Sequence, residues 1–212
     1  MKKEKINEII KILDKEYGNV DIALEFSNVF ELLVATILSA QCTDKRVNIV
    51  TSTLFKKYKT IKDYATADLE EFEKDIKSTG FYRNKTKNII ATANIILDKF
   101  NGIVPKTMEE LITLKGVARK TANIVLGSGY GIHVGIAVDT HVIRLTNLIG
   151  LSKNSDPKKI EKDLMKIIPK KNWRNISFEI QTLGRRVCIA RRPKCNICPI
   201  KHLCNTGKKF ED

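Results

Sequence analysis

The sequence predicts an all-α protein. Apolar residues recur at the 3.6-residue period of amphipathic helices over most of the chain, and no segment shows the sustained alternation that half-buried strands require. Capping residues and glycine stops fall at the ends of the periodic stretches. The one segment that looks extended, residues 132–138, is expected to cross between two domains.

Apolar stripes place the helices in order along the chain. The run over residues 28–38 is apolar nearly all round, which is typical of a buried central helix. The other stripes each bury one helix face, and several end at a glycine. They cover residues 6–13 before Gly18, 47–54, 69–76 before Gly80, 89–100 before Gly102, and 160–167.

Capping residues mark three helix starts. Thr107 and Glu110 have the spacing of a capping box. Asp156 followed by Pro157 forms an N-cap and first-position pair. Asp139 is a good N-cap for a helix that runs to about residue 149.

The charge balance points to a polyanionic partner. Lys and Arg number 38 against 24 Asp and Glu, which gives a net charge of +14. Nucleic acid is therefore the first expectation and an anionic membrane surface the second, while a merely solvated lysine coat stays open. With 42% hydrophobic and 29% charged residues, the composition excludes disorder and membrane classes. The first eight residues carry no secretory signal, and no apolar run reaches membrane-spanning length, so a soluble cytoplasmic protein is expected.

Four of the five cysteines gather near the C-terminus with the spacing C-x6-C-x2-C-x5-C: Cys188, Cys195, Cys198 and Cys204. In a reducing compartment such a cluster indicates metal or cofactor ligation rather than disulfides. Zinc usually takes two short-spaced pairs, whereas uneven arms suit ligands spread around an iron–sulfur cubane. The spacing favours iron–sulfur and leaves zinc open. Cys42 is expected to be a packing residue.

Basic residues surround these cysteines, and two interpretations fit them. Cations would offset the charge of a thiolate-bound cluster, or they would face phosphates. The sequence does not separate the two, and the residues are Arg185, Arg186, Arg191, Arg192, Lys194 and Lys201.

Residues 111–122 place a tight glycine turn between two short helical stretches. The second stretch is expected to start at about Ala118, and its unpaired N–H groups would suit a phosphate. Gly116 would let the backbone approach that phosphate closely. An ordinary helix–turn–helix packing element is the alternative.

Three motifs in order carry a specific resemblance. Residues 114–122 (LKGVARKTA), residues 137–141 (AVDTH) and the cysteine tail together resemble the endonuclease III family, the helix-hairpin-helix DNA glycosylase/AP lyases with a [4Fe-4S] cluster. Residues 38–41, 43–44 and 78–82 also look like its members. The resemblance implies a six-helix barrel over residues 22–133 with the hairpin at about 107–127. Residues 1–21 and 134–212 would form the second domain, with the cluster on the four tail cysteines.

The resemblance also implies site residues. Lys120 would be the nucleophile and Asp139 its acidic partner, although Asp139 also fits a structural cap and His141 a structural histidine. Gln41 would fill the space of an extruded nucleotide and Phe81 would intrude on the opposite strand, with a core position as the alternative for Phe81. The backbone of damaged double-stranded DNA would meet Lys115, Gly116, Ala118, Arg119, Arg191 and Arg192.

The implied function is removal of oxidised pyrimidines by a monomer acting on prokaryotic nucleoid DNA. Two rival functions stay open at this point. They are a monofunctional mismatch glycosylase, whose relatives generally lack a lysine at position 120, and a non-catalytic DNA-binding or redox-sensing iron–sulfur protein.

The hairpin departs from the family pattern Leu-Pro-Gly-Val-Gly at two positions. Lys115 stands in place of the proline and Ala118 in place of the second glycine. The first change loosens the turn by about half a kcal/mol. The second is acceptable only if the φ angle of Ala118 is negative.

Overall fold

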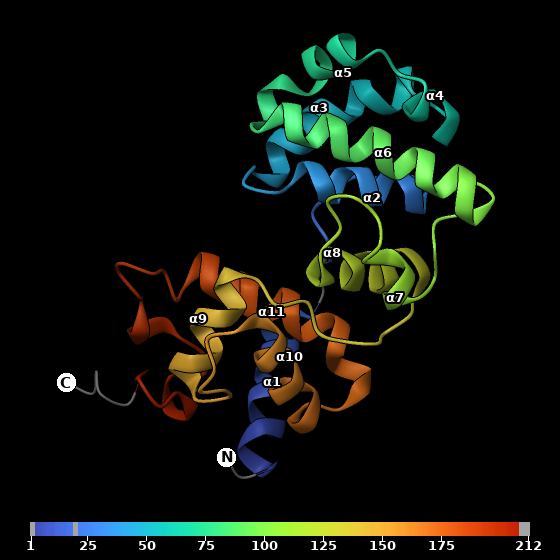
Figure 1. The fold of residues 1–212 in the computed structure, drawn as a ribbon. Coiled ribbons are helices and arrows are strands. Elements are labelled where there is room, and N and C mark those ends of the chain that lie inside the picture. The colour runs from blue at the N-terminus through green and yellow to red at the C-terminus, as the bar shows by residue number, and fades with distance from the viewer. Residues whose placement is uncertain (1–2, 19–20, 208–212) are drawn as a thin grey trace. The chain divides into compact units, whose positions relative to one another are not determined.

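The structure, a computed structural model, describes residues 3–18 and 21–207 and contains no strand in those ranges (Figure 1). The all-α prediction is confirmed. Residues 1–2, 19–20 and 208–212, which the resemblance assigns to the terminal domain, lie outside the described residues. None of the helices in these ranges has the length and apolar character needed to cross a bilayer.

The chain divides into two compact units. One is Ala23–Val134, and the other combines Met1–Ile22 with Gly135–Asp212. The chain crosses between them after Ile22 and again after Val134, and the second crossing falls inside the irregular segment 132–138. Both ends of the sequence therefore belong to a single unit.

The unit Ala23–Val134 is a set of helices packed around α2 and α6. Residue periodicity places most of them where the sequence predicts, although α4 and the π-helical turn η2 were not expected. The elements are α2 (Val29–Leu38), α3 (Asp44–Lys57), α4 (Ile61–Ala65), α5 (Leu69–Ile76), η1 (Lys77–Thr79), α6 (Tyr82–Phe100), α7 (Met108–Leu111), α8 (Arg119–Ile124) and η2 (Val125–Gly129).

Helix α2 forms the centre of this unit, as its nearly all-round apolar sequence predicts. Every residue from Leu32 to Leu38 is buried. Helix α6 packs against α2, α4 and α5 through the stripe Ile89, Ala93 and Ile96, each with no exposed surface. The long helix α6 thus has one face in the core. Its other residues can contact the loops that lie beside it.

The other unit is built from both ends of the chain. Helix α1 packs against α11, and α11 packs against α9 (Figure 1). Ile9 and Leu13 of α1 share an apolar core with Leu145 and Ile180. The elements are α1 (Lys3–Tyr17), α9 (Thr140–Ile149), α10 (Pro157–Ile167), η3 (Lys170–Asn172), α11 (Trp173–Arg186), η4 (Cys195–Ile197) and η5 (Lys201–Leu203).

The predicted helix ends are confirmed. The Thr107 side chain accepts a hydrogen bond from the Glu110 N–H at 3.3 Å, and Asp156 accepts one from the Lys159 N–H at 2.9 Å. Helix α1 ends at Tyr17, directly before Gly18. Short polar side chains that accept from the third backbone N–H satisfy donors that the helix itself leaves unpaired.

Glu179 is a carboxyl group buried between α11 and α1. Its side chain belongs to a residue that is 1% exposed, and neither carboxylate oxygen has a hydrogen-bond partner within the described chain. Burial raises the pKa of Glu179 to about 7, and the negative charge of Asp14 on α1 adds to the increase. The core of this unit therefore contains a carboxyl group that favours its neutral form.

We expect Glu179→Gln to change how stability depends on pH. Because the pKa of Glu179 is higher in the folded state than its ordinary value of 4.5, wild-type stability should fall as pH rises from about 4.5 to 7 and then level off. The introduced amide cannot ionise, so above pH 7 the variant should exceed wild type in unfolding free energy by up to about 3 kcal/mol. Urea unfolding at pH 5 and pH 8 measures the difference.

Glu16→Gln provides the matched control, because Glu16 is an exposed carboxylate on α1. It should leave the pH dependence of the wild type intact. Equal pH slopes for wild type and Glu179→Gln would show that Glu179 is not buried as described.

Candidate functional site

The glycine turn lies between α7 and α8 and is supported by α6. Gly116 has φ of +75°, a conformation that favours glycine, and a Cβ at this position would lie 2.9 Å from the Asn88 Nδ2 atom. The Thr92 hydroxyl donates to the Lys115 carbonyl oxygen at 2.9 Å. Because C=O and N–H point in opposite directions across a trans peptide, this bond directs the Gly116 N–H away from α6. The sequence anticipated a phosphate contact as the reason for the glycine, and packing on Asn88 supplies a second reason.

Helix α8 begins directly after the turn. Ala118 is its N-cap with φ of −91° and ψ of 170°, which is ordinary extended backbone. The predicted start at about residue 118 and the required negative φ are both confirmed. Lys120 lies in the first turn of α8 and is exposed, while Ala122 and Asn123 on the same helix are buried. The helix thus fixes its backbone in the core and leaves the Lys120 amine accessible.

Asp139 belongs to the other unit, where it precedes α9. Its Oδ1 atom accepts a hydrogen bond from the Val142 N–H at 2.9 Å, so the capping role is confirmed. The preceding residues Ala137 and Val138 are buried, and the Ser177 hydroxyl donates to the Ala137 carbonyl. The Asp139 carboxylate is partly exposed and held in one orientation. Lys120 and Asp139 are therefore each positioned by their own unit.

Gln41 and Phe81 lie on two exposed loop tips of the unit Ala23–Val134. Both have left-handed backbone, with φ of 54° and 49°. The Phe81 residue is 63% exposed, which rules out the core position considered for it. A large aromatic side chain held in solvent on strained backbone is unusual and favours a contact role.

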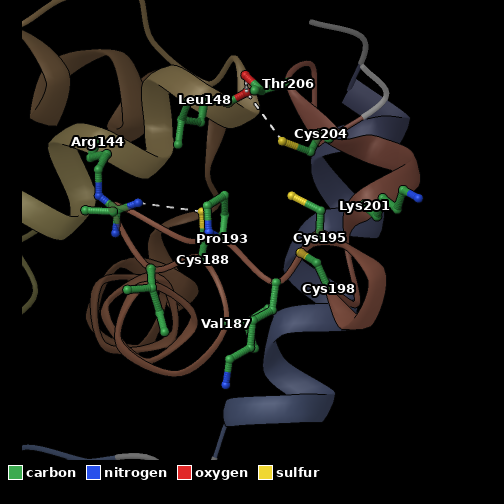
Figure 2. A pocket seen from close by; sticks show the side chains of 14 residues that line it. Arg144, Leu148, Val187, Cys188, Pro193, Cys195, Cys198, Lys201, Cys204 and Thr206 are labelled. Atoms are coloured by element: carbon green, nitrogen blue, oxygen red, sulfur yellow. Dashed lines mark hydrogen bonds between the residues drawn. The ribbon is translucent and has the colours of Figure 1, made fainter. Parts of the chain in front are cut away.

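The four tail cysteines line one cavity of about 310 Å³, which Figure 2 shows from close by. Cys188 follows α11, Cys195 opens η4, and Cys198 and Cys204 follow η4 and η5. Apolar side chains that include Leu148, Val187 and Pro193 close the remaining walls. The space is thus mostly apolar, bordered by thiols and large enough for an inorganic core.

The four cysteines give the cavity a donor set of thiols alone, which suits an iron–sulfur cubane. Zinc needs four ligand atoms within about 2.3 Å of one centre, whereas a cubane is held by thiolates around a larger object. The four thiols lie around a cavity of about 310 Å³, a size that accommodates the larger object.

Charges around the cavity also suit thiolate ligands. The Arg144 guanidinium donates to the Cys188 sulfur at 3.7 Å. Burial raises the pKa of the Cys188 and Cys198 thiols, and the positive charge of Arg144 opposes that increase at Cys188. A bound metal replaces these protons, since metals ligate the thiolate form.

The basic residues near the four cysteines include some that line the cavity and some that do not. Arg144, Lys194 and Lys201 contribute to the lining of the cavity. The Arg144 guanidinium contacts the Cys188 sulfur, whereas the Lys201 ammonium points away from the sulfur atoms in Figure 2. Arg191 and Arg192 are exposed and lie outside the cavity lining. Cys42 lies in the other unit, on the α2–α3 loop, and is partly buried, so it is no ligand of this cavity.

The chain matches known family descriptions over most of its length. Residues 34–170 match the HhH-GPD superfamily base excision DNA repair proteins, and residues 188–204 match the iron-sulfur binding domain of endonuclease III. Endonuclease III of Synechocystis sp. is 52% identical over 207 residues, which cover 98% of this chain and 94% of that protein. Endonuclease III of Bacillus subtilis is 45% identical over 194 residues, which cover 91% and 88%.

Solved structures show the same fold. A non-covalent endonuclease III–DNA complex has a TM-score of 0.93 at 44% identity, covering 99% of this chain and 98% of that chain. A trapped endonuclease III–DNA covalent intermediate gives the same values. A thermostable thymine-DNA glycosylase has a TM-score of 0.88 at 21% identity over 97% of this chain and 98% of that chain, a likeness of fold alone.

We expect the purified protein to be brown and Cys198→Ala to be colourless. Removing one of four ligands leaves the cluster incompletely held, so iron and sulfide should be lost together. Visible absorbance and iron and sulfide analysis, which give a one-to-one ratio for a [4Fe-4S] cluster, check this. Cys42→Ala is the control and should keep its colour, and zinc in place of iron in the wild type would contradict the assignment.

Proposed function

The chain belongs to the endonuclease III family of base excision DNA repair proteins, and we propose that it removes oxidised pyrimidines from damaged duplex DNA as a bifunctional DNA glycosylase and AP lyase. The observation that carries this proposal is the exposed Lys120 amine in the first turn of α8, directly after the supported turn at Gly116. An amine there can reach the sugar of a strand whose phosphate lies on the turn. A monofunctional glycosylase has no need of a lysine at this position.

Lys120 is proposed as the nucleophile. Its neutral amine attacks C1′ of the damaged nucleotide, and the C1′–N bond breaks with its electron pair leaving on the base, which takes up a proton. Opening of the C1′–O4′ bond gives an imine. Loss of a C2′ proton then breaks the C3′–O bond, so the strand is cut 3′ to the lesion and the phosphate leaves. Water hydrolyses the imine and restores Lys120.

Asp139 is proposed to stabilise positive charge on the sugar or to accept a proton from it. Its Oδ1 atom is engaged as the N-cap of α9, and no described contact engages Oδ2. A fixed carboxylate stabilises positive charge that develops at C1′ or accepts a proton during elimination. The cap hydrogen bond already orders the carboxylate, so no side-chain conformational entropy is lost when the substrate binds.

The remaining contacts are proposed to hold and open the duplex. The turn and the start of α8 bind a phosphate through backbone N–H groups and cations, with Lys115, Gly116, Ala118 and Arg119 as the residues. The exposed Gln41 and Phe81 tips enter the duplex where the damaged nucleotide leaves the stack. The protein acts as a monomer on DNA in the bacterial cytoplasm.

A [4Fe-4S] cluster on the tail cysteines is proposed to be structural, supplying a charged core that shapes the loop between Cys188 and Cys204. The exposed Arg191 and Arg192 on that loop then face DNA phosphates. Arg144 stays at the cavity wall and offsets part of the thiolate charge.

We expect Lys120→Ala to abolish covalent trapping. Wild-type protein with abasic-site duplex and borohydride should give an adduct, because borohydride reduces the imine, and the variant should give none. Strand cleavage should fall by more than about 10³-fold. Lys162→Ala, which removes an exposed lysine of α10, is the control. Base release without any wild-type adduct would identify a monofunctional glycosylase, and neither product would indicate a non-catalytic binder.

We expect Asp139→Asn and Asp139→Ala to separate charge from capping. Asn is as good an N-cap as Asp, so Asp139→Asn should keep wild-type stability while turnover falls by about 10²-fold or more. Asp139→Ala should lose turnover similarly and also lose about 1 kcal/mol of stability. Single-turnover kinetics and thermal unfolding measure both. Wild-type turnover in Asp139→Asn would leave Asp139 with the capping role alone.

A further inference from the structure

Lys85 is a buried lysine that joins two loops of the unit Ala23–Val134. It lies in the first turn of α6 and is 4% exposed, although lysine side chains normally reach water. Its ammonium donates to the Leu38 and Thr79 carbonyl oxygens, each at 2.8 Å. A buried ammonium persists only when such acceptors replace its water.

Each acceptor closes a helical segment. Leu38 is the last residue of α2, and Thr79 is the last residue of η1. Carbonyls at helix ends lack partners within the helix, and a cation there is favoured by the helix dipole. Burial lowers the pKa of Lys85, and the neighbouring Cys42 thiol opposes that effect. One ammonium therefore bonds the last carbonyl of two helical segments, and these two residues, 38 and 79, are 41 positions apart in sequence.

Both segments lead directly into the exposed tips. Gln41 follows Leu38 by three residues, and Phe81 follows Thr79 by two. Among the described residues, the non-glycine positions with positive φ are Gln41, Phe81 and Asn101. Left-handed backbone at Gln and Phe is strained and persists only where the surroundings impose it. The Lys85 hydrogen bonds lie within reach of both strained positions, since a residue spans at most about 3.6 Å.

We propose that Lys85 is a positioning residue that holds the Gln41 and Phe81 tips in one fixed arrangement for entry into the duplex. This inference rests on the proposed function, because it takes both tips to be the DNA-inserting residues. Lys85 is buried and acts on DNA only through the tips. Since both carbonyls share one ammonium, a shift of either loop disturbs the support of the other.

A double-mutant cycle tests this role. Lys85→Met removes the ammonium and keeps most of the side-chain volume. With duplex DNA carrying thymine glycol opposite 2-aminopurine, we expect turnover to fall by about 10- to 100-fold, as for small misplacements of a reacting group. The 2-aminopurine fluorescence rise that reports unstacking should shrink. In the Gln41→Ala/Phe81→Ala background, Lys85→Met should cause no further loss.

Controls keep the result specific. Lys99→Met removes an exposed lysine from the far end of α6, which matches the charge change, and should behave as wild type. If Lys85→Met is unfolded by circular dichroism, the cycle is run with Lys85→Gln, which stays polar but whose shorter, neutral side chain no longer bonds both carbonyls as the ammonium does. Lys85→Arg, which keeps charge and donors, should recover part of the fluorescence change.

Two outcomes would overturn the inference. One is wild-type turnover and fluorescence in a folded Lys85→Met or Lys85→Gln variant. The other is an equal loss of turnover from Lys85→Met in wild type and in the Gln41→Ala/Phe81→Ala background. That result would mean that Lys85 serves folding alone. Either result leaves wild-type trapping at Lys120 intact, whereas failure of the proposed function removes the wild-type adduct itself.

Discussion

The left-handed turn at Gly116 is the constraint on which the placement of Lys120 depends. Its inner side is filled by Asn88, and its preceding carbonyl is held by the Thr92 hydroxyl, both from α6. Helix α6 is itself fixed by a fully buried stripe against α2, α4 and α5. The position of the amine is therefore set by the core of the unit rather than by the short helix α8, which is too short to be stable alone.

The same constraint explains why two departures from the family hairpin are tolerated. Proline at position 115 would preset φ in the unfolded chain, but here the Thr92 hydrogen bond to the Lys115 carbonyl fixes the turn in the folded state. A positive φ at position 118 would favour glycine, but Ala118 has φ of −91°, which any residue adopts. At position 116 only glycine fits, because its φ is positive and a Cβ would collide with the Asn88 side chain.

Apolar periodicity and capping residues predicted much of the fold, and the elements that they missed have identifiable sequence causes. Apolar period and caps gave most helices, but α11 was missed because buried Ser177, Glu179 and Thr182 interrupt its stripe of Ile176, Ile180 and Leu183. Lys85 was missed for a similar reason. It stands four residues before Ile89, on the same buried stripe of α6, yet a lysine is assumed to face water. Cysteine spacing pointed to four thiols that the structure places around one cavity, and the match to the iron-sulfur binding domain of endonuclease III favours a cluster over a single ion.

Capping and chemistry are not alternatives for Asp139. A catalytic carboxylate is most effective when its orientation is fixed before the substrate arrives, and an N-cap hydrogen bond to the Val142 N–H fixes it. The bond uses one lone pair of Oδ1, and an ionised carboxylate has about four acceptor sites. The helix start thus orients the carboxylate at little cost to its charge. A residue at the start of a helix can serve the fold and the reaction through the same carboxylate. The two roles are separable only by a side chain that keeps the cap and loses the charge.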